Sequence, residues 1–125
     1  MKDRKINLEV ASLLAKEFNA SLTAAAIKLV KQATVPAFVT CHNQTCLTWH
    51  QRSSASTSEF FVKPELHQDT DAFRMAFGGV GGMSRPRQEL ASRWLSGRDV
   101  FRLEVNSQSI KLPDATVLTI FSLVK

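Results

Sequence analysis

The first third of the chain carries apolar residues at the spacing of two amphipathic helices. The first apolar stripe comprises Leu8, Ala11, Leu14, Ala15 and Phe18 and predicts a helix over residues 7–18. Asn19 follows, and asparagine tolerates the left-handed conformation that ends many helices. Ser21 offers a hydroxyl that can cap a second helix, whose stripe comprises Leu22, Ala25, Ala26 and Leu29. Residues 7–32 are therefore expected to form a closely packed helix pair joined by a tight turn.

The middle of the chain is predicted to contain a β-hairpin and a short helix. Pro36 marks the change, and residues 37–41 and 46–51 are rich in strand formers on either side of a polar turn. Residues 52–58 are expected to form a polar loop and residues 60–62 a brief strand. A short helix is expected over Asp71–Phe77, capped by Asp69 or Thr70. The glycine-rich residues 78–87 predict a flexible loop, and the pattern around Trp94 and Leu95 leaves the type of element open.

The last quarter carries the strongest strand pattern. Phe101, Leu103 and Val105 alternate with polar residues. Ile110 and Leu112 continue the alternation in shifted register, which suggests a bulge near Gln108. Pro113-Asp114 predicts a turn before an apolar strand over Val117–Val124. Helices followed mainly by strands favour an α+β fold, with one domain over 1–125, a helix pair at 7–32 and a sheet-containing part at 35–125.

Composition and cysteine content favour an ordinary folded protein. The chain has 125 residues, of which 44% are apolar and 22% charged, and a chain of this length can bury a core without disulfides or metals. No stretch approaches the ~20 apolar residues of a membrane span, and the charged N-terminus leads into no signal-peptide core. We therefore expect a cytoplasmic protein without a membrane segment, in which Cys41 and Cys46 are thiols.

The charge pattern suggests where a partner could bind. The formal net charge is +5, and residues 71–100 hold five arginines against three acidic residues. Arginine forms bidentate pairs with carboxylate or phosphate, so arginines beside the glycine-rich loop suit an acidic partner. A mild positive charge also suits plain solubility. The candidate partner-binding residues are Lys28, Lys31, Arg85, Arg87, Arg93 and Arg98.

No catalytic or metal-ligating residue and no cofactor is assigned from the sequence. The spacing of Cys41, His42, Cys46 and His50 matches no recurrent zinc pattern; the two thiols could face each other across the hairpin, but ordinary packing is the simpler expectation. The glycines after residue 77 follow a helix and lack the spacing of a phosphate-binding loop. Capping explains Asp69 and Asp71, Glu104 is expected to face water, and packing explains Trp49 and Trp94. The sequence therefore predicts a protein that is not an enzyme.

Short motifs along the chain resemble the part of ImmA/IrrE-type metallo-endopeptidases that follows the peptidase core. The segment VASLLAKEFNASLTAAAIKLV carries the strongest likeness. Further matches are Pro36–Val39, Trp49, Arg52-Ser53, Trp94-Leu95, Gln108-Ser109-Ile110 and Val117-Leu118-Thr119-Ile120. Asn19 replaces the family's usual glycine, and Ser107 stands where a glutamate is frequent. The resemblance implies a helix-turn-helix-like pair and a GAF-like domain, but the zinc-binding His-Glu-x-x-His motif is absent from the sequence.

Three functions follow as alternatives. The leading one is a non-catalytic regulator that binds another protein; the resemblance extends it to an inhibitor or anti-defence protein of a bacterial mobile element. The second is a DNA-binding regulator that presents Thr23, Ala24, Lys28, Lys31 and Gln32 from the second helix. The third is a GAF-like sensor of a small ligand, which needs an apolar pocket beside the sheet. A homodimer through an exposed edge of the C-terminal strands is a further alternative.

Overall fold

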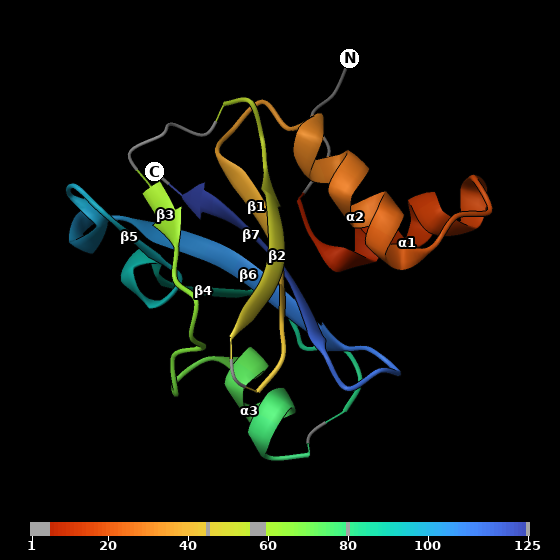
Figure 1. Ribbon diagram of the computed structural model, residues 1–125. Helices are drawn as coiled ribbons and strands as arrows, with labels where there is room; N and C mark the ends of the chain where they lie inside the picture. Colours follow the sequence, from red (N-terminus) through yellow and green to blue (C-terminus); the bar gives the residue numbers. More distant parts are fainter. Residues whose placement is uncertain (1–5, 45, 56–59, 80, 125) are drawn as a thin grey trace.

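The computed structural model describes residues 6–44, 46–55, 60–79 and 81–124, and its helices and strands form an α+β fold (Figure 1). The helices are α1 (Leu8–Glu17), α2 (Leu22–Lys31) and α3 (Asp71–Phe77), with two 3-10 turns, η1 (Ala91–Arg93) and η2 (Val100–Arg102). The strands are β1 (Ala37–His42), β2 (Leu47–Arg52), β3 (Phe60–Val62), β4 (Arg87–Leu90), β5 (Leu95–Gly97), β6 (Glu104–Lys111) and β7 (Val117–Val124).

Local capping residues set the ends of the helix pair. The Asn7 side chain accepts a hydrogen bond of 2.9 Å from the Val10 amide at the start of α1. Asn19 has a φ of 52° in the turn, and the Ser21 hydroxyl then accepts a bond of 3.0 Å from the Ala24 amide at the start of α2. The predicted helix pair and its turn are therefore confirmed.

The helix pair packs on one face of the large sheet. Leu8, Ala11, Leu14, Ala25, Ala26, Leu29 and Val30 are buried against Ala37, Val39, Leu118 and Ile120. The prediction that Phe18 belongs to this apolar stripe is wrong, because Phe18 is the C-cap of α1 and 61% of it is exposed. The Lys28 ammonium lies 5.5 Å from the centre of its ring instead.

The large sheet has five antiparallel strands in the order β2-β1-β7-β6-β4. The predicted hairpin corresponds to β1 and β2, although Cys41 lies opposite Trp49 rather than Cys46; Thr45 lies outside the described residues. The expectation of an exposed C-terminal strand edge is wrong. Both β6 and β7 have a neighbour on each side, so β2 and β4 form the edges.

Strand β6 runs through Gln108 without the predicted bulge. Residues 104–111 pair in unbroken register with residues 124–117 of β7. The shift in apolar alternation arises because both faces of β6 are covered: Val105, Ser107 and Ser109 are buried on one face, while Gln108 is buried on the other. Serine at the buried positions hides the alternation from the sequence pattern.

The second face of the sheet supports another core. Phe38 and Trp94 stack on Phe121, with ring centroids 5.0 and 5.2 Å away, respectively. Helix α3 and the short elements from β3 to η2 on either side of it in the sequence contribute to this core, and Leu95 and Val100 are buried in it. Trp94 is 3% exposed, which confirms its packing role.

The sequence pattern was least informative between α3 and β6. The pattern gave no sign of β4 and η1, whereas β3 was expected but its pairing with β5 was not. Phe101 lies in η2 with 82% of its surface exposed, so its assignment to a strand is wrong. Short elements of this kind bury only alternate residues and leave too few positions for a periodicity to emerge.

The turn between β6 and β7 places a non-glycine residue in a strained conformation. Ala115 has a φ of 71°, a region in which a β-carbon costs about 1 kcal/mol. Ala115→Gly is therefore expected to raise the free energy of unfolding by roughly 0.5–1 kcal/mol, measured by urea denaturation. Ala33→Gly, at a residue with ordinary φ, is the matched control and should not stabilise; a loss of stability in Ala115→Gly would contradict the argument.

Candidate functional site

The six predicted partner-binding residues do not gather in one place. Lys28 and Lys31 are exposed on α2, whereas Arg85, in the loop before β4, and Arg87, the first residue of β4, lie beside α3. Arg93 pairs with Glu89, and Arg98 is exposed in the turn after β5. Only Arg85 and Arg87 are brought together with another arginine, Arg74, which the sequence analysis did not select.

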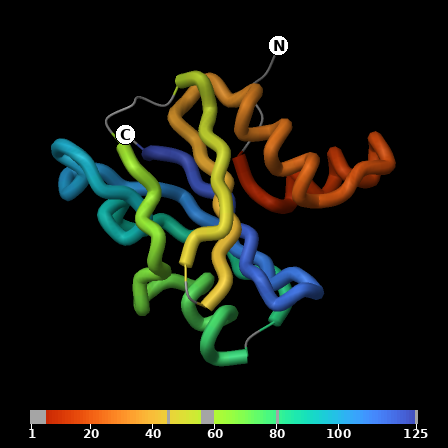
Figure 2. Tube along the Cα trace, viewed as in Figure 1, coloured from red at the N-terminus to blue at the C-terminus, as the bar shows by residue number. Residues whose placement is uncertain are grey.

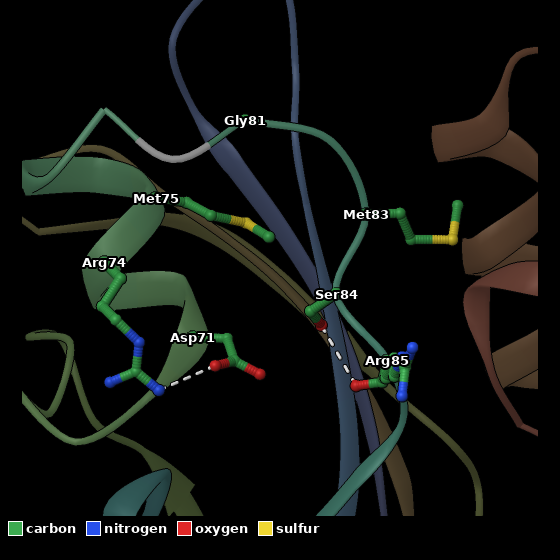
Figure 3. A pocket seen from close by; sticks show the side chains of 7 residues that line it. All are labelled: Asp71, Arg74, Met75, Gly81, Met83, Ser84 and Arg85. Atoms are coloured by element: carbon green, nitrogen blue, oxygen red, sulfur yellow. Dashed lines mark hydrogen bonds and ion pairs between the residues drawn. The ribbon is translucent and has the colours of Figure 1, made fainter.

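A pocket of about 360 Å³ opens between α3 and the loop before β4 (Figure 3). Asp71, Arg74 and Met75 extend from α3 on one side, and Ser84 and Arg85 stand on the loop strand on the other. The lining residues are Asp71, Arg74, Met75, Gly81, Met83, Ser84 and Arg85. The pocket thus has charged groups on both walls and an apolar side chain between them.

The α3 sequence accounts for one wall of this pocket. Thr70 caps the helix, since its hydroxyl accepts a hydrogen bond of 3.1 Å from the Phe73 amide. Ala72, Met75 and Ala76 are buried towards the sheet. Asp71 and Arg74, three residues apart, therefore share the outward face of the helix.

Asp71 is the counter-ion of two arginines. Its Oδ1 atom accepts a hydrogen bond of 2.8 Å from Arg74 Nη2 and lies 3.5 Å from Arg87 Nη1. Among the described residues, no carboxylate lies within 4.0 Å of the Arg85 guanidinium. Arg74 and Arg85 line the pocket, and Arg87 reaches its Asp71 from outside the lining. Together these three arginines and one aspartate have a formal charge of +2, which suits an anionic group.

The other wall is attached to β6 by a set of hydrogen bonds around Ser84. The Ser84 amide donates to the Ser109 carbonyl (2.8 Å), and the Ser109 amide donates to the Ser84 hydroxyl (2.9 Å). Met83 forms a β-bridge with Ile110, and Figure 2 shows the part of the trace just before β4 passing beside the β6–β7 turn. Gly82 has a φ of 79°, a conformation that glycine adopts readily. It lets the backbone turn just before Met83 and Ser84 pair with β6. The hydrogen bonds of Ser84 therefore fix the backbone position from which Arg85 extends.

Gln108 joins this wall to the helix pair. Its Oε1 atom accepts a hydrogen bond of 2.7 Å from the Leu8 amide at the start of α1, and its Nε2 atom donates one of 2.8 Å to the Ser84 carbonyl. Gln108 is 2% exposed, so both backbone groups would lose a partner without access to much solvent if the amide were removed.

Arg93 has a structural partner rather than a free charge. Glu89 is buried, and its Oε1 atom accepts a hydrogen bond of 3.2 Å from Arg93 while Oε2 accepts one of 2.8 Å from the Trp94 indole. The Ser107 hydroxyl also donates to Glu89 Oε2. A buried carboxylate requires such partners, so Arg93 compensates Glu89 and helps to hold Trp94 in the core.

The histidines and cysteines do not converge. Cys41 is buried and Cys46 exposed. No group of three or more His, Cys, Asp or Glu side chains within the described part of the chain is arranged to hold a metal ion. His42 is buried beside Trp94; its Nδ1 atom and Thr40 Oγ1 have no hydrogen-bond partner among the described residues. Burial lowers the pKa of His42, partly opposed by its contact with the Lys63 carbonyl.

The helix pair offers a much weaker charged surface. Ala24, Lys28, Lys31 and Gln32 are exposed on α2 as expected, and Thr23 is half-buried. Glu9 and Glu17 are exposed on the neighbouring α1. Residues 7–32 hold three lysines against two glutamates, a formal charge of +1 that attracts a nucleic-acid backbone only weakly.

Fold and pocket together define an α+β protein with an arginine-lined surface pocket. A scan against protein-family models finds no match, and a search of curated proteins finds none either. The likeness to ImmA/IrrE-type proteins therefore rests on the short sequence motifs alone. Every helix in the described ranges is too short or too polar to cross a lipid bilayer.

The Gln108 bridge can be tested by its contribution to stability. Gln108→Ala leaves the Leu8 amide and the Ser84 carbonyl without their partner, and each such buried group costs roughly 1–3 kcal/mol. We expect the free energy of unfolding to fall by about 2–4 kcal/mol in urea denaturation. Gln88→Ala removes an exposed amide whose side-chain partner in the described part of the chain is Glu104, and it is expected to lower the free energy of unfolding far less. Equal losses in the two variants would contradict this role.

Burial of His42 predicts a dependence of stability on pH. Because the folded chain holds the pKa of His42 below its ordinary value of about 6.5, the unfolded chain binds this proton first as the pH falls. The contribution of neutral His42 to the free energy of unfolding should be fully present above about pH 6.5 and should be lost progressively below it. Burial and the charge of Arg52 also lower the pKa of His50. His50 should therefore add to the loss of stability as the pH falls.

We expect urea midpoints measured between pH 7.5 and 5.5 to fall less steeply in His42→Gln than in the unchanged protein. His50→Gln is the control and should retain most of the slope, since His50 is only half-buried. A His42→Gln protein whose midpoint falls as steeply as that of the unchanged protein would show that His42 is not the titrating group.

Proposed function

We propose that this protein is a non-catalytic regulatory domain that acts by binding another protein, and that it contacts an acidic group of that partner through the arginine pocket. The observation that carries this proposal is the charge imbalance at the pocket: Arg74 and Arg85 line it, and Arg74 and Arg87 share Asp71 as their counter-ion. Arginine is favoured at protein interfaces because its fork of donors matches a carboxylate or phosphate.

The position of the pocket supports a role in contact rather than catalysis. Arg85 is exposed, and the side chains of Arg74 and Arg87 are 49% and 39% exposed, so each of the three side chains is accessible from the surface. The hydrogen bonds around Ser84 and Gln108 fix the wall that carries Arg85, which lowers the ordering cost of binding. An inhibitor of a host factor or defence complex is one form of this function, and that extension rests on the ImmA/IrrE resemblance alone.

The alternative functions receive less support from the fold. A GAF-like sensor needs an apolar pocket beside the sheet, whereas one face of this sheet carries the Phe38–Phe121–Trp94 stack and the other packs against the helix pair. The helix pair buries Ala11, Ala25 and Ala26 on the sheet, and residues 7–32 carry a formal charge of only +1. The arginine pocket is the better-supported contact site.

Affinity capture with paired charge variants tests the proposal. The unchanged protein and Lys28→Ala/Lys31→Ala should recover the same partner from host lysate, whereas Arg74→Gln/Arg85→Gln should reduce its recovery roughly tenfold or more because charge-assisted hydrogen bonds are lost. Recovery should also fall as the salt concentration rises.

Thermal unfolding of each variant establishes that it is folded before the capture is compared. Absence of any partner above background, or equal recovery by Arg74→Gln/Arg85→Gln, would count against the pocket as the contact site. Loss of recovery in the lysine variant alone would assign the interface to the helix pair instead.

A further inference from the structure

The charge at the pocket distinguishes between the anions that could occupy it. Asp71 neutralises one of the three arginines and leaves two positive charges. A carboxylate of a partner would compensate one of these charges. A phosphate monoester carries a charge of about −1.5 to −2 at pH 7 and would compensate both. Net charge therefore favours a phosphoryl group over a carboxylate.

The geometry of the arginines supports the same choice. Arg74 reaches Asp71 through Nη2 at 2.8 Å, and Arg87 reaches the same oxygen at 3.5 Å. Each guanidinium has five N–H donors, so this single acceptor leaves donors available on both. Arg85, from the opposite wall, adds a guanidinium with no carboxylate within 4.0 Å among the described residues. A phosphoryl group offers three oxygens, so it can accept hydrogen bonds from more than one guanidinium at once.

The rest of the pocket suits the side chain that would carry the phosphoryl group. The cavity measures about 360 Å³, and Met75 lies between its charged walls (Figure 3). Met75 is 2% exposed and held in the core, so it supplies a fixed apolar contact for a methylene group or ring. The ligand then needs a charged end and a short apolar stem, as a phosphorylated side chain has.

Combining these observations, we propose that the pocket is a recognition site for a phosphorylated side chain of the partner protein, in which Arg74, Arg85 and Arg87 bind the phosphoryl oxygens. This inference rests on the proposed function and specifies the group that is recognised. Asp71 acts as an internal counter-ion: it holds Arg74 and Arg87 in position in the free protein and opposes the incoming anion. Its presence therefore lowers the affinity of the site for any anion, and the two positive charges that remain favour a dianion over a monoanion.

Peptide titrations monitored by NMR test the site directly. The probes are a short glycine-flanked peptide carrying phosphoserine, the same peptide with glutamate, and inorganic phosphate. We expect the phosphoserine peptide to shift the amide signals of residues 71–75 and 81–85 and to bind about tenfold more tightly than the glutamate peptide. Its affinity should rise as the pH increases through the second phosphate pKa of about 6. Equal binding of the two peptides would overturn the inference.

Two aspartate variants separate the role of Asp71 from a general change in charge. Asp71→Asn removes the internal counter-ion and should tighten binding of the phosphoserine peptide several-fold. Asp69→Asn makes the same charge change at a residue whose ion-pair partner among the described residues is His67, and it should have little effect. Arg74→Gln/Arg85→Gln should abolish the signal shifts. Equal effects of the two aspartate variants would show that only net charge matters and would contradict the assigned geometry.

Two further measurements distinguish a phosphorylated protein from a free phosphate ion. They also test the phosphoryl site independently of the proposed binding function. Inorganic phosphate that binds as tightly as the phosphoserine peptide would overturn recognition of a side chain. Phosphatase treatment of the lysate should abolish partner capture. Capture that depends on Arg74 and Arg85 but survives phosphatase would retain the proposed function and reject the phosphoryl group. Selective peptide binding without any captured partner would support the phosphoryl site and reject the proposed function.

Discussion

The side-chain amide of Gln108 lies where the first helix, the central sheet and the loop before β4 meet, and each of its two ends bonds a backbone group of a different segment. A buried amide is stable only when both its donor and acceptor atoms are satisfied. This requirement links the start of α1 to Ser84, although the two segments lie far apart in sequence. Without that link, the wall carrying Arg85 would lose one of its attachments to β6. The geometry of the pocket therefore depends on a residue that does not line it.

Coverage of both faces of the sheet explains the unusual polarity of its interior. The helix pair covers one face, and α3 with the segments from β3 to η2 covers the other. Ser109 and Thr119 are buried between these layers, and their hydroxyls bond each other at 2.8 Å. Glu89 is satisfied by Arg93, Ser107 and Trp94. These bonds allow polar residues to occupy positions that would otherwise need apolar side chains.

The arginines differ in function because they differ in their partners. Arg93 forms an ion pair with the buried Glu89 and compensates the charge of that carboxylate. Arg74 and Arg87 share one carboxylate at the surface, and Arg85 has none within ion-pair distance in the described part of the chain. Exposed pairs contribute little to stability, so Asp71 can exchange its arginines for another anion at small cost. The proposed contact with an acidic partner requires such arginines, whose present ion pairs can be replaced with little loss of stability.

The sequence by itself determined the helix pair, the β1–β2 hairpin, α3 and the two long C-terminal strands, because their signals are local: Asn7 and Ser21 cap helices through bonds to residues three positions away, and apolar spacing reveals the remaining elements. It also indicated Arg85 and Arg87 as contact residues. Only the tertiary structure decided that Arg74 and Asp71 join them, that β6 is straight and that Phe18 and Phe101 are exposed. Those outcomes depend on which segments cover each face of the sheet, and such coverage arises from contacts between residues that no short sequence window contains.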